Sequence, residues 1–323
     1  MLNISKHVKI YNCTYMIYSI FVISFFSCNN ERNEVSEISE QEIVVLGIAQ
    51  DAGYPHINNS DEWFELRNDP SKKRLVISLA VVDHATNQKW LIDATPDMPQ
   101  QLDELASNIL KSPSLIDGVF LTHAHIGHYT GLMYFGREAM GAKNIPVYAM
   151  PQMKKFIESN GPWNQLVSLN NIQLNKLQAD ATVKLSGSIR ITPFLVPHRA
   201  EYAETVGYKI EGATKSALFI PDIDKWELWE KNILEEVTNV DYAFLDATFF
   251  KDGEISRPMS EVPHPFIEET VEIFKNASKE IKNKIIFIHF NHSNPVIDPK
   301  NTDRLRLEEE GFRFGSRGMR LGL

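Results

Sequence analysis

The chain has 323 residues, of which 43% are hydrophobic and 10% aromatic. This content is enough to bury a large core, so it excludes a disordered chain and favours a single α/β domain. The formal net charge of -9 argues against a nucleic-acid ligand, because a protein that binds phosphate backbones presents an excess of lysine and arginine.

Residues 1–28 are typical of an export signal. Two lysines precede an apolar stretch over residues 16–26, which is short for a membrane span and matches the apolar region of a signal peptide. The stretch ends at Cys28, preceded by serine, a pattern that resembles a bacterial lipoprotein signal. We therefore expect an exported protein on the periplasmic or outer surface, attached to the membrane by a lipidated Cys28 and a flexible tether over residues 29–41. An uncleaved membrane anchor is the alternative.

The remaining residues, 42–323, alternate short apolar runs with amphipathic stretches, which predicts a mixed, layered α/β domain. Strands are expected over residues 43–46, 74–82, 89–92, 118–121, 146–149, 189–195, 216–220, 242–245 and 284–287. Helices are expected over residues 98–110, 131–140, 152–160, 225–235 and 265–277. Both cysteines fall within the first thirty residues, so a metal bound by this domain must be held by histidine and carboxylate side chains.

The strongest sequence signal is a histidine cluster that follows the expected strand 118–121. His123 and His125 share one side of an extended segment, and the turn into the next element can bring His128 to the same centre. Neutral imidazoles are good ligands for zinc, iron or manganese. A solvated surface cluster is the alternative, but it would not need the buried strand that precedes these histidines.

The His-x-His-x-x-His run after an apolar strand resembles the signature of the metallo-β-lactamase superfamily. Further stretches resemble motifs of that superfamily in the same order: residues 91–97, 196–198, 219–222, 244–249, 263–265 and 288–295. Residues 244–249 and 263–265 are most similar to the ribonuclease Z and phosphodiesterase branch, whereas residues 45–55 and 288–295 are most similar to the pyrroloquinoline-quinone biosynthesis protein B branch. The resemblance implies an αββα sandwich of two mixed β-sheets flanked by helices.

The resemblance also implies roles for particular residues. His123, His125 and His198 would bind a first metal, His128 and His289 a second, and Asp222 would bridge the two. A water held between two such cations can supply hydroxide near neutral pH. His264 would lie outside the metal shell as a general acid or as a donor to the developing oxyanion. Without a metal, His198 and His264 would be ordinary turn histidines and Asp222 a helix cap or turn residue.

One position departs from the family pattern. The superfamily usually has aspartate before the third clustered histidine, and this chain has Gly127. Either the protein uses one metal, or Asp51 or His56, after the first expected strand, replaces the missing ligand. Asp51 could equally be a turn residue beside a glycine, and His292 is a further, less favoured candidate.

These observations predict a hydrolase that uses a metal-activated water on an ester, with a small phosphodiester-like molecule as substrate. The aspartate at 222 resembles the phosphodiesterase branch, which disfavours a β-lactamase. Zinc is the expected ion, as one or two per chain, with iron or manganese as alternatives. The alternative functions are a non-hydrolytic metalloprotein that resembles the pyrroloquinoline-quinone branch, where iron would promote oxidation, and a binding protein without turnover. The sequence names neither the substrate nor the oligomeric state.

Overall fold

The computed structural model describes residues 39–199 and 201–323. The first described strand begins at Gln41, next to the expected domain start at Glu42. The expected signal segment, residues 1–28, and residues 29–38 of the expected tether lie outside the described residues. Among the residues that are described, no helix is both long enough and apolar enough to cross a membrane.

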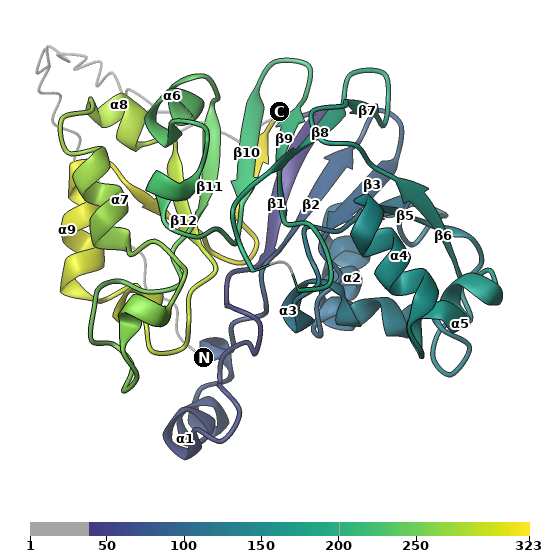
Figure 1. The fold of residues 1–323 in the computed structure, drawn as a ribbon, viewed down its shortest axis with the longest axis horizontal. Coiled ribbons are helices and arrows are strands. Elements are labelled where there is room, and N and C mark those ends of the chain that lie inside the picture. Colours follow the sequence, from purple (N-terminus) through teal and green to yellow (C-terminus); the bar gives the residue numbers. More distant parts are fainter. Residues whose placement is uncertain (1–38, 200) are drawn as a thin grey trace, which may run out of the picture. The chain divides into compact units, whose positions relative to one another are not determined.

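Two seven-stranded sheets form the centre of the domain (Figure 1). The first sheet contains, in spatial order, β14 (Arg320–Gly322), β1 (Gln41–Gly47), β2 (Ser78–Asp83), β3 (Gln88–Ile92), β4 (Gly118–Phe120), β5 (Ile145–Ala149) and β6 (Ile172–Lys176). The second contains β13 (Arg313–Phe314), β12 (Ile285–Ile288), β11 (Tyr242–Asp246), β10 (Ser216–Ile220), β9 (Val206–Glu211), β8 (Arg190–Leu195) and β7 (Val183–Lys184).

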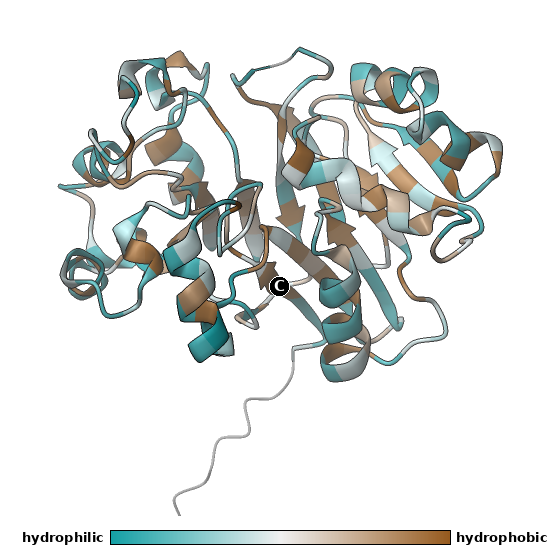
Figure 2. Cartoon of the chain, turned by 90° about the horizontal axis from the view of Figure 1, so that it is seen from below, coloured by the Kyte–Doolittle hydropathy of each residue, from teal (hydrophilic) through white to brown (hydrophobic). Residues whose placement is uncertain are grey.

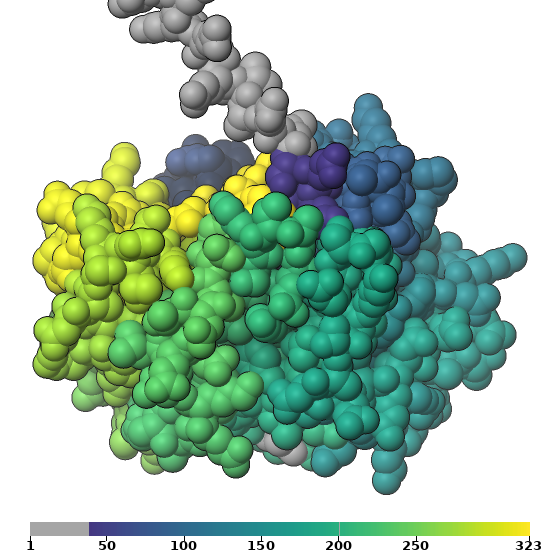
Figure 3. Space-filling model, turned by 90° about the horizontal axis from the view of Figure 1, so that it is seen from above, coloured from purple at the N-terminus to yellow at the C-terminus, as the bar shows by residue number. Residues whose placement is uncertain are grey.

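Both sheets are mixed and follow the same plan. In the first sheet the pairs from β14 to β3 are antiparallel and those from β3 to β6 are parallel. In the second sheet the pairs from β7 to β10 are antiparallel and those from β10 to β13 are parallel. The pairing of β1 with β14 brings the start of the described domain beside its carboxyl end, as Figure 3 shows where purple and yellow atoms meet.

Helices flank each sheet. The helices that lie beside the first sheet are α2 (Met98–Glu104), α3 (Ile126–Tyr129), α4 (Pro151–Ser159) and α5 (Trp163–Ser168). Those beside the second sheet are α6 (Ile233–Thr238), α7 (Ile267–Ile273), α8 (Lys279–Lys282) and α9 (Thr302–Glu310), while α1 (Ser60–Asn68) follows the loop after β1. Two mixed sheets flanked by helices confirm the predicted αββα architecture.

The side chains of β1 show how the layers are held together. Ile43 and Val45 belong to the core that contains the second sheet, whereas Val44 and Leu46 belong to the core beneath α2 and α4. This alternation follows from the two-residue period of a strand, and it buries β1 on both faces. Figure 2 shows largely hydrophobic strands in the interior and surrounding helices that contain both hydrophilic and hydrophobic residues.

Two expected helices take a different form. The segment expected as a helix over 131–140 is a 3-10 helix over Thr130–Phe135. The segment expected as one helix over 225–235 is a 3-10 turn at Trp226–Leu228 followed by α6. The break has a local cause, because the side chain of Asn232 accepts hydrogen bonds from the backbone N–H groups of Leu234 and Glu235 and so begins a new helix there.

Candidate metal centre

The residues that the sequence analysis singled out lie at the carboxyl ends of strands from both sheets. His123 follows β4, His198 follows β8, Asp222 follows β10 and His289 follows β12. The carboxyl ends of parallel strands meet at one edge of a sheet, where loops can present side chains to a common point. The fold therefore brings together ligands that are separated by as many as 166 positions in the chain.

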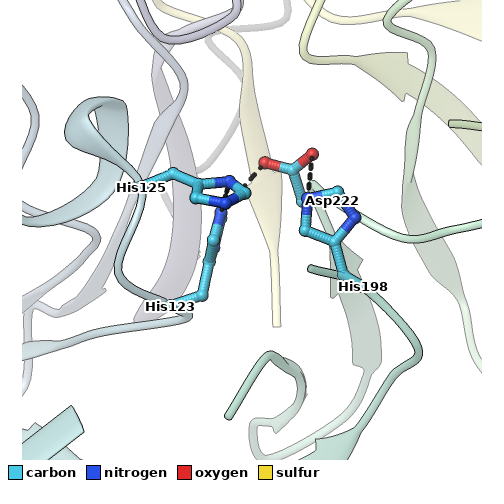
Figure 4. A group of neighbouring side chains, drawn as sticks. All are labelled: His123, His125, His198 and Asp222. Carbon is cyan, nitrogen blue, oxygen red and sulfur yellow. Dashed lines mark hydrogen bonds and ion pairs between the residues drawn. The ribbon is translucent and has the colours of Figure 1, made fainter. Parts of the chain in front are cut away.

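The first metal position consists of His123, His125, His198 and Asp222. One ligand atom from each lies within 4.8 Å of all the others, and Figure 4 shows the rings gathered around the Asp222 carboxylate. His123 Nε2 lies 3.3 Å from Asp222 Oδ2, and His198 Nε2 lies 3.4 Å from Asp222 Oδ1. A cation about 2.1 Å from each ligand in a tetrahedron requires ligand atoms about 3.4 Å apart. The spacing fits a zinc-sized ion.

The second metal position contains His128, His289 and again Asp222. His128 Nε2 and His289 Nε2 lie 3.1 Å and 3.2 Å from Asp222 Oδ2. Since Asp222 also contacts the histidines of the first position, its carboxylate lies between the two positions, where a bridging ligand would be. Asp51 is close by, with Oδ1 3.3 Å from His128 Nε2.

Several polar atoms at this centre are buried without a hydrogen-bond partner: Asp51 Oδ1, His128 Nε2, Asp222 Oδ1 and His289 Nε2. An unpaired buried polar atom costs about 1–3 kcal/mol, so a group of them converging on one point needs an explanation. A bound cation would satisfy all of them. The donor set of imidazole nitrogens and carboxylate oxygens is also one that zinc accepts.

A second layer of side chains holds the rings in place. The Nδ1 atoms of His123 and His289 donate to the hydroxyl oxygens of Thr122 and Thr248, at 2.9 Å and 2.8 Å. Each threonine hydroxyl in turn donates to a carboxylate at a strand end: Thr122 to Asp93, and Thr248 to Asp246. Each sheet thus contributes a histidine–threonine–aspartate chain of hydrogen bonds. With the proton of each ring assigned to Nδ1, the Nε2 lone pairs of His123 and His289 are free to bind a cation.

Carboxylates hold two further rings directly. His128 Nδ1 lies 2.8 Å from Asp93 Oδ2, and His198 Nδ1 lies 3.0 Å from Asp224 Oδ1. The sequence analysis did not assign roles to Asp93, Asp224 or Asp246. Asp93 and Asp246 stand at the ends of apolar strands in motifs that resembled the family, and that placement is the signal that could have identified them.

Two residues at this edge of the sheets have an unusual backbone conformation. Asp93 follows β3 with a φ of 68°, and His289 follows β12 with a φ of 64°. Residues other than glycine rarely adopt this left-handed conformation, and where they do the surrounding structure must stabilise it. In this conformation the side chain of Asp93 reaches the ring of His128, and the side chain of His289 points to the Asp222 carboxylate.

Asp222 and the surrounding carboxylates set the charge of the centre. Burial opposes ionisation of Asp222, but His289 and His198 hold the pKa of its carboxyl well below the usual range. Burial lowers the pKa of His125 to about 4. The pKa of His128 is raised well above its usual value, since Asp93, Asp222 and Asp51 outweigh the effect of burial.

His264 differs from the other histidines of the centre. Its Nδ1 lies 2.8 Å from Asp246 Oδ2 and 3.2 Å from Asp222 Oδ1, so one ring nitrogen faces two carboxylates. Burial disfavours the charged ring, yet Asp246 and then Asp222 raise its pKa to about 9. His264 therefore carries a proton at neutral pH, which suits a proton donor better than a ligand.

Two other candidates lie apart from the ligand atoms. The rings of His56 and His292 stack on each other with centroids 4.1 Å apart. His292 Nδ1 contacts Glu62 Oε1 at 2.7 Å, and His56 Nδ1 contacts the carbonyl of Ile57. Neither histidine belongs to a group of potential ligands within residues 39–199 and 201–323.

Comparisons with known proteins find relatives and solved structures that match most of the chain. Coenzyme PQQ synthesis protein B from Gluconobacter oxydans is 27% identical over 86% of this chain and 97% of its own length. Among solved structures, Zn(2+)-bound PqqB from Methylobacterium extorquens matches 87% of this chain and all of that chain, with 21% identity and a TM-score of 0.71. A diphosphatase from the PhnP family matches 87% of this chain and 96% of that chain, with 24% identity and a TM-score of 0.60. Proteins of the pyrroloquinoline-quinone branch suggested by the motifs thus match in sequence, and a PhnP-family diphosphatase matches in fold.

The comparisons correct the expectation of a lipid-anchored protein. Coenzyme PQQ synthesis protein B relatives match over 97% to 99% of their own length, against 86% to 87% of this chain. These relatives therefore match this chain over nearly their whole length. That likeness gives no support to a lipoprotein or to a membrane anchor at Cys28. We withdraw both assignments. Export remains a prediction, because its signal lies outside the described residues.

The family follows from one further match. The model of the beta-lactamase superfamily domain matches residues 88–290, which include both metal positions apart from the Asp51 loop. The chain therefore belongs to the beta-lactamase superfamily.

Proposed function

We propose that the protein is a metal-dependent hydrolase that cleaves an ester in a small, phosphodiester-like molecule. The observation that carries this proposal is the convergence of unpartnered, buried histidine and carboxylate atoms on Asp222. A superfamily that includes metal-dependent hydrolases, and the likeness in fold to a diphosphatase, support the same reaction class.

In this proposal His123, His125 and His198 hold a first zinc ion, His128 and His289 a second, and Asp222 bridges them. Bound divalent cations supply a nucleophile from water at neutral pH and stabilise negative charge on the ester oxygens. The protein contributes fixed ligand directions, through Thr122, Asp93 and their counterparts on the other sheet, so that little reorganisation accompanies the reaction.

Two cationic side chains suit an anionic ester. His264 is held in its protonated form with Nδ1 facing Asp222 and Asp246, so the proton on its Nε2 is the one it can donate to the leaving oxygen. Arg199, whose side chain is 58% exposed, places Nη2 3.1 Å from His125 Nε2 at the edge of the centre. A guanidinium at that edge can pair with two oxygens of a phosphate group.

The proposal is tested with protein from residue 39 onward, loaded with zinc, manganese or iron and then freed of unbound metal. Elemental analysis should find at least one metal per chain, and the loaded protein should hydrolyse an activated aryl phosphodiester faster than the matched carboxylic ester. His123→Ala should lose metal and activity together. A folded parent protein that binds no metal, or a loaded one that cleaves neither ester, contradicts the proposal.

A second candidate is a non-hydrolytic metalloprotein, and the match to coenzyme PQQ synthesis protein B over nearly its full length favours it. In that case iron would be the working ion. Protein purified in air should then contain iron, and the iron form should consume oxygen with a suitable reduced substrate while the zinc form does not. Hydrolysis of a phosphodiester by the zinc form would instead support the hydrolase over the non-hydrolytic metalloprotein.

A further inference from the structure

We propose that Asp51, on the loop after β1, supplies the carboxylate that Gly127 cannot and completes the second metal position. This inference rests on the proposed metal centre. The sequence left two alternatives open, a single metal or a replacement ligand at Asp51 or His56, and this inference selects Asp51, so that the anionic ligand comes from a different part of the chain.

The first argument is steric. A Cβ atom built on Gly127 would lie 2.2 Å from Asp51 Oδ1, 2.6 Å from Asp51 Cα and 3.0 Å from Asp51 Cγ. A Cβ atom essentially never lies under 3.0 Å from an atom to which it is not bonded, so residue 127 has to be glycine while Asp51 is where it is. The space in which an aspartate at position 127 would begin is thus filled by another aspartate.

The second argument is the direction of the Asp51 carboxylate. Its Oδ1 lies 3.3 Å from His128 Nε2, and ligand atoms of Asp51, His128 and His289 lie within 4.8 Å of one another. Asp51 Oδ1, His128 Nε2 and His289 Nε2 are all buried without a hydrogen-bond partner. The carboxylate oxygens of a turn-forming aspartate would instead accept hydrogen bonds from nearby backbone N–H groups. His128 Nε2 and His289 Nε2 also lie 3.1 Å and 3.2 Å from Asp222 Oδ2, so the group that contains Asp51 adjoins the proposed bridging carboxylate. Imidazole nitrogens and carboxylate oxygens are donors that zinc accepts.

The third argument is that the loop is held in register with the other ligands. The backbone N–H of Gln50 donates to the carbonyl of Phe290 at 2.9 Å, and the N–H of Phe290 donates to the carbonyl of Ile48 at 2.9 Å. The side chain of Asn291 adds a hydrogen bond to the Gln50 side chain at 2.6 Å. Phe290 directly follows His289, so these bonds fix Asp51 relative to a ligand of the same metal position.

The other two candidates for the missing ligand, His56 and His292, do not reach the second metal position. His56 and His292 stack on each other and have other partners, as described above, and neither contributes to a group of ligand atoms in the described part of the chain. They therefore serve as matched controls, since each lies close in sequence to a proposed ligand without sharing its position.

The experiment compares Asp51→Asn with His56→Ala, His292→Ala and the parent, each freed of metal and titrated with Zn²⁺ against a chromogenic chelator. Asparagine keeps the size of the aspartate, so the fold should persist, and circular dichroism and melting temperature check that it does. The parent and both controls should bind two ions, whereas Asp51→Asn should bind the second on the order of 100-fold more weakly. Titration with Co²⁺ gives an independent spectroscopic readout, because loss of one site removes part of the visible absorption.

The outcomes separate this inference from the proposed function. A folded Asp51→Asn protein that binds its second ion as tightly as the parent overturns the role of Asp51 while leaving the metal centre intact. A parent that binds only one ion also overturns it. A parent that binds no ion contradicts the proposed function itself.

Discussion

At the scale of single residues, His264 shows how one imidazole can differ in role from its neighbours. Its Nδ1 is engaged by Asp246 and Asp222, and its pKa is raised to about 9. We expect His264→Gln to keep the full metal content and to lower kcat by about 100-fold or more, the usual contribution of a positioned proton donor.

The pH profile separates a donor from a structural residue. Because a proton donor must be protonated, turnover by the parent should fall as the pH rises through about 9, and His264→Gln should lack that decline. Metal content is measured alongside by elemental analysis. If the variant instead lost one ion per chain, His264 would be a ligand.

The sequence singled out the candidate ligands of the centre but not the residues that orient them. The histidine cluster can be recognised in the sequence because its members, His123, His125 and His128, lie within six positions after an apolar strand. Thr122 and Thr248 carry no such signal, since Thr122 merely precedes a histidine, Thr248 has no histidine beside it, and only the fold shows that each hydroxyl reaches a carboxylate. Roles that depend on distant partners become visible only when the strands are placed.

At the scale of elements, the short helix α3 is packed directly against the loop after β1. Gly127→Ala would push a Cβ into Asp51, which should cost about 1–3 kcal/mol of folding free energy and weaken the second metal position. Gly187→Ala is the matched control, because nothing lies within 4 Å of its Cβ and its stability should stay close to that of the parent. Urea unfolding and zinc titration of the two variants measure both effects, and equal results for them would contradict this account of α3.

Five strands were not predicted from the sequence, β6, β7, β9, β13 and β14, and the structure explains three of them. β9 was not expected, because Gly207 interrupts its pattern, yet a Cβ at that position would lie 2.6 Å from the ring of Phe194 on the neighbouring strand. The glycine makes room for an aromatic side chain that propensity alone cannot anticipate. β13 and β14 are too short to show a period; β13 forms by parallel pairing with β12, and β14 by pairing with β1 at the other end of the domain sequence.

Some missed helices did carry signals. Helix α9 begins after Asn301, whose side chain accepts from the N–H groups of Asp303 and Arg304, and it ends at Gly311 with a φ of 111°. Such caps were legible in the sequence, but the helix is strongly charged and lacks an apolar stripe. An account based on hydrophobic periodicity therefore overlooked it.

At the scale of the whole domain, the candidate centre joins the two sheets. His123, His125 and His128 come from the first sheet, whereas His198, Asp222 and His289 come from the second. The hydroxyl of Tyr208, on β9, also donates to the carbonyl of Leu121, which is the residue after β4. Hydrogen bonds and candidate metal ligands thus lie together where the two sheets meet. We therefore expect a bound metal ion to affect the stability of the entire domain.

This arrangement predicts a large effect of metal on thermal unfolding. A ligand that binds only the folded state stabilises it by about 4 kcal/mol when its free concentration is about 1,000 times the dissociation constant. For a domain of this size such a gain raises Tm by on the order of 10 °C. Without metal, the unpartnered atoms around Asp222 remain unsatisfied, which lowers the stability of the apo protein further.

Scanning calorimetry of the zinc-loaded and chelator-treated protein measures this shift, and added zinc should reverse the effect of the chelator. His264→Gln should keep the full shift, because it removes no proposed ligand. His123→Ala should reduce it strongly, because it removes a ligand that one sheet contributes to a cation shared with the other. If the parent melted at the same temperature with and without zinc, the metal would not link the two sheets, and the centre would have to act without coupling to the fold that surrounds it.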